Sequence, residues 1–168
     1  MKLTDTEAVA RTLDTARVRY LVAGGLAVAA HGYGRLTFDL DLIVQLTPGN
    51  ARAALDALAA IGYRPRVPVT SAQFADAATR NGWIRDKNMT VLNLWSEHHR
   101  ETPVDIFVTE PFDFDAEYDR ALVQEFLPGI PIRFVGLDAL IRMKELAGRP
   151  KDLDDLEHLQ RLREDRKQ

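Results

Sequence analysis

Apolar residues recur along this chain with two different periods, and these periods mark its first helices and strands. Residues 4–17 carry apolar side chains near helical spacing, which predicts a first helix. The apolar run from Arg19 to Gly24 predicts a buried strand that ends at a glycine pair, and the alanine-rich stretch from Gly25 to His31 predicts a short helix. The run from Phe38 to Val44 predicts a second strand, because the turn residues Thr47-Pro48-Gly49 follow it.

The rest of the chain continues as a mixture of helices and strands. The next predicted elements are a helix capped by Asn50 and ended by Gly62, a proline-containing edge strand over 63–69, a helix capped by Ser71 that runs to about Arg80, and strands over 89–95 and 104–108. They are followed by a helical turn or loop over 111–120, one or two short strands over 121–135, a helix over 138–147, and a last helix from Pro150 to about Arg163. Strand and helix do not alternate regularly, which favours an α+β fold over a doubly wound parallel sheet.

This pattern predicts a mixed β-sheet flanked by helices, with a helical pair at the C-terminal end. We expect a core over residues 1–135 and a C-terminal helical segment over 136–168 that packs on it, so that both form one compact unit. A chain of 168 residues can bury a sizeable core, and it contains no cysteine, so neither disulfides nor thiolate zinc sites are expected.

Composition narrows the classes of function. Hydrophobic residues make up 46% and charged residues 28%, an ordinary balance for a globular protein. No apolar run is long enough for a membrane helix and no signal peptide is evident, so we expect a cytoplasmic protein without a membrane partner. The net charge of −3 argues against a basic coat for long nucleic acids, although local basic patches remain compatible with it.

The most informative segment is Phe38-Asp-Leu-Asp-Leu-Ile-Val44. In a strand, alternate side chains share a face, so Asp39 and Asp41 lie together opposite the apolar residues. Neighbouring carboxylates repel each other, and a divalent cation such as Mg²⁺ relieves this repulsion because it prefers oxygen ligands. The simpler interpretation is a solvated strand face. A third acid, Asp105, interrupts the apolar strand 104–108, and three converging carboxylates suit a two-metal transfer reaction.

The glycine pair lies at a position that suits a phosphate-binding turn. Gly24 and Gly25 follow one strand and open a helix, and the two aspartates lie on the next strand. Glycine permits close approach of a ligand to the backbone, and helix starts attract phosphate, although a tight turn explains the pair equally well. Arg35, just ahead of the acidic strand, could contact a phosphate or form a surface salt bridge.

Together these residues resemble the signature of the nucleotidyltransferase (polymerase-beta-like) superfamily. The motif consists of Leu21-Val-Ala-Gly-Gly25, Asp39-Leu-Asp41 after thirteen intervening residues, and the later Asp105. With Arg35-x-Thr37, Lys144 and Lys151-Asp152, it looks most like the AbiEii-type toxins of toxin–antitoxin and abortive-infection systems. The N-terminal part of this motif is also similar to that of small aminoglycoside and lincosamide nucleotidyltransferases.

The resemblance implies a nucleotidyltransferase fold with defined roles for these residues. Asp39, Asp41 and Asp105 would bind two Mg²⁺ ions, and Gly24 and Gly25 would position the nucleoside triphosphate. The resemblance also implies that a lysine and an aspartate from the C-terminal part of the chain lie near the nucleotide. These residues correspond to Lys144 and Asp152.

Several of these residues have other interpretations. Lys144 lies on an otherwise apolar helix face and either contacts a phosphate or extends to solvent. Asp152, near the start of the last helix, is also explained by the helix dipole alone. Asn93 alternates with Leu92 and Leu94 and could point into the site. Trp83 and Trp95 could stack a base, whereas core or edge packing is the commoner role of tryptophan.

We therefore hypothesise an enzyme that transfers a nucleoside monophosphate from a triphosphate to a hydroxyl acceptor. The favoured version is a toxin-like enzyme with a cognate antitoxin as partner, acting on the 3′ end of a tRNA or on a protein hydroxyl. The alternatives are an enzyme for a small molecule such as an aminoglycoside, and a non-catalytic nucleotide-binding or regulatory module. The sequence leaves the acceptor, the base and the oligomeric state open.

Overall fold

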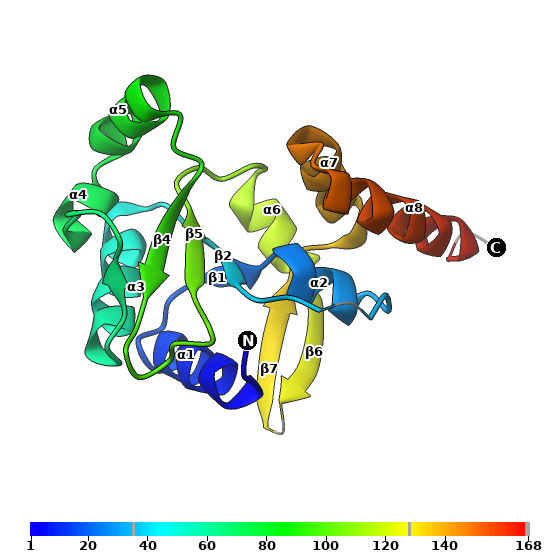
Figure 1. Ribbon diagram of the computed structural model, residues 1–168, viewed down its shortest axis with the longest axis horizontal. Helices are drawn as coiled ribbons and strands as arrows, with labels where there is room; N and C mark the ends of the chain where they lie inside the picture. The colour runs from blue at the N-terminus through cyan, green and yellow to red at the C-terminus, as the bar shows by residue number, and fades with distance from the viewer. Residues whose placement is uncertain (35, 128, 167–168) are drawn as a thin grey trace.

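The computed structural model describes residues 1–34, 36–127 and 129–166, and a seven-stranded mixed sheet runs through its centre (Figure 1). The strand order is β3-β4-β5-β2-β1-β7-β6. The strands are β1 (Tyr20–Val22), β2 (Leu40–Val44), β3 (Arg64–Pro65), β4 (Val91–Trp95), β5 (Val104–Phe107), β6 (Leu122–Leu127) and β7 (Ile130–Phe134). Parallel pairing joins β2 to β5 and β1 to β7, and the other neighbours are antiparallel. The predicted α+β fold with a mixed sheet is confirmed.

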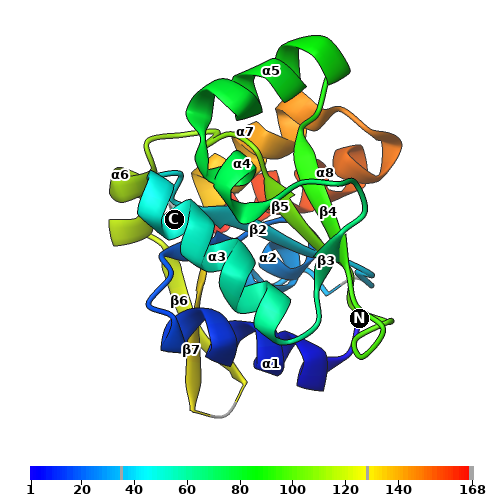
Figure 2. The same cartoon turned by 90° about the vertical axis from the view of Figure 1, so that its left-hand side faces the viewer.

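Helices cover both faces of this sheet. They are α1 (Leu3–Thr15), α2 (Gly24–Ala30), α3 (Pro48–Ala60), α4 (Ser71–Ala75), α5 (Ala77–Lys87), α6 (Phe114–Asp119), α7 (Leu137–Ala147) and α8 (Pro150–Asp165). Figures 1 and 2 show α1 and α3 on one face and α2, α7 and α8 on the other. Central strands are therefore buried on both sides, which explains why Leu42 and Ile43, neighbours on opposite faces of β2, are both fully buried.

The strand that carries the acidic pair is shorter than predicted. It begins at Leu40 rather than Phe38, so Asp39 precedes the strand, and Phe38 is 74% exposed instead of buried. The strand register explains this difference, because the pairing of β2 with β5 begins at Leu40 and its pairing with β1 begins at Leu42. Nothing in the sheet therefore covers the side chain of Phe38.

Two predicted helix caps are wrong. Thr47 is the N-cap of α3 and Pro48 its first residue, whereas the Asn50 side chain accepts a hydrogen bond from the Arg19 amide at 2.8 Å. Thr70 rather than Ser71 caps α4, with Gln73 completing a capping box. The helix predicted to reach residue 80 is broken at residue 76, where a new aspartate cap starts α5.

The C-terminal helices form the predicted pair. Gly148, in the left-handed conformation with φ 58°, ends α7, and Pro150 begins α8. The preceding strand β7 pairs with β1 in the sheet, which ties this end of the chain to its beginning. We propose on this basis that the segments 1–135 and 136–168 form one unit. No helix among the described residues is long and apolar enough to cross a membrane.

Candidate functional site

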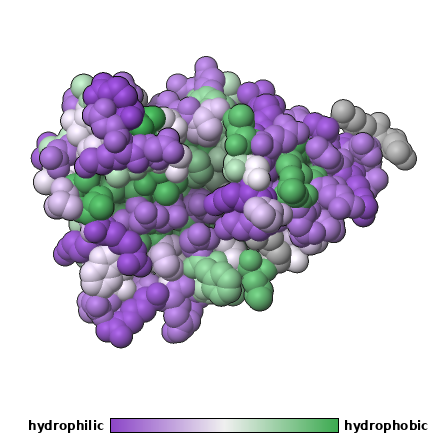
Figure 3. Space-filling view, turned by 45° about the horizontal axis from the view of Figure 1, so that its top comes forward, coloured by the Kyte–Doolittle hydropathy of each residue, from purple (hydrophilic) through white to green (hydrophobic). Residues whose placement is uncertain are grey.

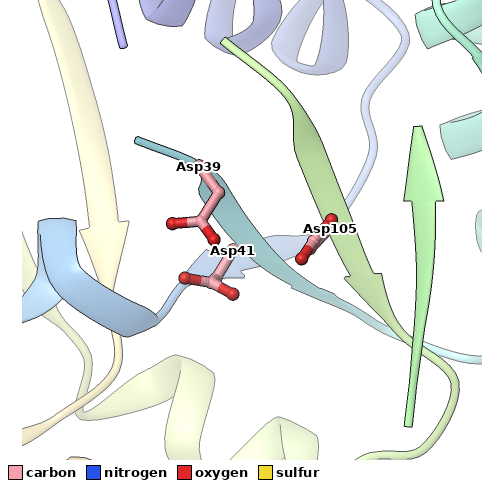
Figure 4. Close-up of side chains that lie close together, drawn as sticks. All are labelled: Asp39, Asp41 and Asp105. Carbon is pink, nitrogen blue, oxygen red and sulfur yellow. The ribbon is translucent and has the colours of Figure 1, made fainter. Parts of the chain in front are cut away.

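Two neighbouring strands bring the three predicted acids together. Asp41 on β2 lies directly beside Asp105 on β5 in the parallel register, and Asp39 immediately precedes β2. All three are half-buried, and one carboxylate oxygen of each lies within 4.8 Å of the others. Figure 4 shows the side chains entering the same space from the two strands. This all-oxygen set has the composition that Mg²⁺ prefers.

Electrostatics make this cluster unfavourable without a cation. Burial, together with repulsion from Asp39 and Asp105, raises the pKa of Asp41 to about 6, although Lys144 and Lys151 partly oppose the rise. Burial also raises the pKa of Asp105, and the hydrogen bond that Asn93 Nδ2 donates to its Oδ1 at 2.7 Å opposes this. Clustered acids with raised pKa values mark a candidate active site.

The turn before α2 is shaped around one of these acids. Gly24 has φ +61°, and a Cβ built on it would lie 1.7 Å from Asp41 Oδ2. Only glycine therefore fits this position, both for its backbone conformation and for the space it leaves to the carboxylate. The Ala23 amide donates to the Asp41 carbonyl at 2.9 Å, which holds the turn and β2 together.

Substitution of Gly24 by alanine should displace the Asp41 carboxylate and so weaken metal binding. We expect a loss of about 1–3 kcal/mol of folding free energy from the strained backbone, and a smaller rise of the melting temperature when Mg²⁺ is added. Thermal denaturation with and without Mg²⁺ measures both effects. Gly34→Ala is the control, since a Cβ there meets nothing within 4 Å. Equal behaviour of the two variants would contradict the tight fit at Gly24.

The acids open into a cavity of about 540 Å³ between the sheet, α5 and α7. One part is polar and contains Gly24, Gly25 and the acidic cluster. The other is apolar, and Ile84, Phe107 and Met143 are among the residues that line it. Figure 3 shows hydrophobic surface gathered in the hollow of this face, with hydrophilic side chains around it. A cavity with this volume and this mixed lining lies in the usual range of small-molecule binding sites.

Two cations where α7 meets α8 also line the cavity. They are Arg149, which was not predicted, and Lys151 at the start of α8, which is part of the sequence resemblance but was given no role in the site. The charges of Asp39 and Asp41 contribute to the raised pKa of Arg149, although its hydrogen bonds to Asp152 are the main cause. The signal available in the sequence was two basic residues at the start of a helix, which on its own is an ordinary surface pattern.

Lys144 lies in the cavity wall, where it is only 5% exposed. Its Nζ donates to Asp152 Oδ1 at 2.8 Å and to Asp155 Oδ2 at 2.6 Å. It therefore neither extends to solvent nor stands alone as a phosphate ligand, because two carboxylates of α8 accept its hydrogen bonds. Asp155 was not predicted.

Asp152 is fully buried and joins this network to the cavity rim. Its Oδ2 accepts a hydrogen bond from Arg149 Nε at 2.7 Å, and it caps the backbone amide of Arg149. Burial would raise the pKa of Asp152, but the hydrogen bonds and charges of Arg149 and Lys144 outweigh it and hold this pKa below its ordinary value. Direct contact of Lys144 or Asp152 with a nucleotide stays a prediction.

The remaining predicted residues are placed as follows. Gly25 is buried at the start of α2 and lines the cavity, and Asn93 points at Asp105. Arg35 lies outside the described residues. Trp83 is partly buried against the core, whereas Trp95 is 37% exposed, on the same face of β4 as Asn93.

Comparison with known proteins places this arrangement among solved structures. No family model and no curated protein sequence matches the chain. The structure is similar to the lincomycin-bound lincosamide antibiotic adenylyltransferase LnuA, with TM-score 0.60, 15% identity and coverage of 96% of this chain and 98% of that chain. It is also similar to the antibiotic-resistance factor ANT(2'')-Ia, with TM-score 0.59, 16% identity and coverage of 98% and 90%.

A third similar structure is that of an antigenic nucleotidyltransferase-like protein from Paracoccidioides brasiliensis. Its TM-score is 0.54 and its identity 16%, with coverage of 93% of this chain and 73% of that chain. Because these likenesses extend over nearly the whole chain, they show that it has the nucleotidyltransferase fold.

Proposed function

We propose that the protein is a nucleotidyltransferase, which moves a nucleoside monophosphate from a triphosphate to a hydroxyl acceptor with the help of divalent cations. The observation that carries this proposal is the convergence of Asp39, Asp41 and Asp105 within 4.8 Å at the wall of a cavity. Two Mg²⁺ ions bound there would neutralise the carboxylates and polarise the phosphate oxygens. The fold of the similar structures supports the same activity.

The residues of the chain have complementary roles in this reaction. The acceptor oxygen attacks the α-phosphorus, a new O–P bond forms, and the bond to the β-phosphate breaks to release pyrophosphate. Asp105 accepts the hydroxyl proton, and Asn93 orients its carboxylate through the hydrogen bond at 2.7 Å. Arg149 and Lys151 offset the charge of the leaving phosphates at the cavity rim. Gly24 leaves room for the Asp41 carboxylate to face the phosphates.

Mg²⁺ affinity should depend on pH through Asp41. The folded-state pKa of this group is raised to about 6, so its carboxylate is ionised and able to bind metal above that pH and protonated below it. We expect the apparent affinity to be constant above about pH 7 and to fall up to about tenfold per unit below about pH 6. Titration calorimetry in two buffers of different ionisation enthalpy should detect proton release on binding below about pH 6. An affinity that is independent of pH would contradict this assignment.

For the acceptor we propose a toxin-like activity of the AbiEii type, directed at the 3′ end of a tRNA or at a protein hydroxyl and controlled by an antitoxin. The support is that Lys144 and Lys151 line the same cavity as the acids and that Lys144 donates a hydrogen bond to Asp152. The resemblance in sequence at these positions points the same way.

A small-molecule acceptor is the second candidate, and the apolar part of the cavity favours it. Ile84, Phe107 and Met143 could hold an apolar face of a hydroxyl compound. Two similar structures belong to an antibiotic adenylyltransferase and to an antibiotic-resistance factor. The third candidate is a non-catalytic nucleotide-binding or regulatory module of the same fold. The presence of all three acids argues against it, because a module without catalysis would not need them.

One experiment separates these candidates. The protein is incubated with Mg²⁺ and each α-³²P-labelled nucleoside triphosphate, together with total RNA, cell protein or a panel of lincosamides and aminoglycosides. Label in RNA or protein supports the toxin-like proposal, and label in an antibiotic supports the second candidate. The variant Asp105→Asn should lose the transfer. Mg²⁺-dependent triphosphate binding without transfer to any acceptor would support the binding module.

A further inference from the structure

A second cavity, of about 320 Å³, is lined by Arg66 and by residues of the segment from Trp95 to Pro103, which joins β4 to β5. Burial raises the pKa of Asp105 and the charge of Arg66 partly offsets this rise, so this cavity lies near the acidic cluster. The register places Asp41, Asp105 and Asn93 side by side on β2, β5 and β4. The Arg66 amide donates to the Asn93 carbonyl at 3.0 Å, so Arg66 extends this row to the sheet edge. Trp95 lies two residues beyond Asn93 and therefore points to the same face.

The wall of this cavity combines cations with an aromatic surface. Arg66, Arg100, His99 and Trp95 line it, and Glu97 is the one acid among its described lining residues. Glu97 already pairs with Arg100. Trp95 is 37% exposed and lines the cavity, so its side chain is accessible to a ligand there.

Contacts from the core hold part of this wall in place. His99 Nδ1 lies 2.9 Å from Asp5 Oδ1, and its ring stacks on Tyr63 with 5.4 Å between the centroids. Thr102 Oγ1 donates to the other oxygen of Asp5 at 2.9 Å. The imidazole side of the cavity is therefore preformed, and little ordering is needed when a ligand binds.

We propose that this cavity binds the single-stranded 3′ end of an RNA acceptor, with a base stacked on Trp95 and backbone phosphates at Arg66 and Arg100. This inference rests on the proposed nucleotidyl transfer and names its acceptor. Strand geometry puts the Cα atoms of Trp95 and Asp105 roughly 8 Å apart. A terminal nucleotide with its 3′-hydroxyl at Asp105 thus leaves the preceding base near the indole.

The chemistry of the cavity favours RNA over a peptide. Aromatic stacking combined with arginine contacts to phosphate is the usual way in which proteins hold single strands, without selection for sequence. An extended peptide would need backbone partners at the sheet edge. That edge is β3, which is two residues long and ends in Pro65, and proline offers no amide hydrogen. The net charge of −3 fits recognition of a short end rather than of a long duplex.

Binding of a fluorescein-labelled RNA hexamer with a free 3′-hydroxyl tests the proposal without any turnover. Fluorescence anisotropy at low salt should show binding by the wild type. Trp95→Leu should lose at least fivefold in affinity because base stacking contributes about 1–3 kcal/mol, whereas Trp95→Phe should retain most of it. Arg66→Gln should reduce the slope of log affinity against log salt by about 0.7, the effect of one phosphate contact.

The controls separate this inference from the proposed activity. Arg52→Gln on α3 removes an exposed arginine that lies 3.7 Å from Asp56 and lines neither cavity, so RNA affinity should be unchanged. Calorimetry of Mg²⁺ and triphosphate should give the same result for Trp95→Leu and the wild type.

Failure of RNA binding, or equal RNA affinity of Trp95→Leu and the wild type, would overturn the RNA site even if triphosphate binding persists. Transfer of label to protein that requires Trp95 would also overturn it. Absence of triphosphate binding in the wild type would instead remove the proposed transferase activity.

Discussion

Asp41→Asn should abolish nucleotidyl transfer and at the same time make the metal-free protein more stable. The variant loses a metal ligand, and metal ions supply several kcal/mol of transition-state stabilisation, so we expect a rate loss of about a thousandfold. Ionisation of Asp41 destabilises the folded state, because the pKa of this carboxyl group is raised from 3.8 to about 6. That difference corresponds to an upper limit of about 3 kcal/mol at neutral pH.

The pH dependence of this stability effect follows from the same shift. Because protonation favours the folded state, the wild type loses stability as pH rises from 3.8 to about 6, whereas the asparagine variant does not. The advantage of the variant should be absent below about pH 4 and complete above about pH 6. Thermal denaturation in Mg²⁺-free buffer measures it, with a rise of roughly 5 °C at neutral pH.

Two comparisons make this prediction specific. Asp56→Asn, on the exposed surface of α3, should change neither activity nor stability appreciably. Added Mg²⁺ should stabilise the wild type by mass action but leave Asp41→Asn unchanged. If Asp41→Asn melts below the wild type in Mg²⁺-free buffer at neutral pH, the carboxylate is satisfied by the protein itself, and the case for a metal site fails.

Lys144→Met should cause the largest loss of stability of any substitution considered for this site. Lys144 is 5% exposed, and its ammonium donates to the carboxylates of Asp152 and Asp155, which are both fully buried. Removal of one partner from a buried ion pair typically costs about 3–5 kcal/mol, because the remaining charge stays desolvated. For a chain of this length we expect the melting temperature to fall by roughly 10 °C.

A matched surface variant and a second-site variant test the cause of this loss. Lys151→Met removes an exposed lysine from the same turn, so it should change stability by less than about 0.5 kcal/mol while it weakens triphosphate binding. Asp155→Asn added to Lys144→Met should recover much of the lost stability, because Asp152 keeps its bonds to Arg149. A double variant as unstable as Lys144→Met alone would show that packing rather than charge causes the effect.

This network also explains why the C-terminal helices matter for the site. Lys144 on α7 and Asp152 on α8 hold the turn between these helices, and Arg149 in that turn is bonded to Asp152 at the cavity rim. Replacement of the whole buried network, Lys144 together with Asp152 and Asp155, by well-packed apolar residues is often neutral or stabilising, unlike removal of Lys144 alone. We infer that these charges serve to fix the position of Arg149 relative to the acids.

Much of the local structure was encoded in short segments of sequence. The strand around Leu40–Val44, the glycine turn before α2 and the end of α7 at Gly148 were all predicted, because apolar periodicity and glycine or proline signals act over a few residues. The alternation of Asp39 and Asp41 with apolar neighbours also indicated that both acids share a face. The α+β class followed from the irregular order of these elements.

Other features depended on contacts between segments that are distant in sequence. The parallel pairing of β2 with β5 puts Asp105 beside Asp41, and no local pattern specifies which strands become neighbours. The exposure of Phe38 follows from where the partner strands begin. The roles of Arg149 and Asp155 arise from the packing of α8 against α7, and Trp95 belongs to a second cavity only because β4 lies beside β5.

The sequence by itself thus determined the elements, the fold class and the residue types of the acidic cluster. Only the tertiary structure decided that these acids converge, which cations face them and which charges are neutralised in the interior. The physical reason is that periodicity and capping are local interactions along the chain, whereas strand pairing and burial depend on the free energy of the whole packed molecule.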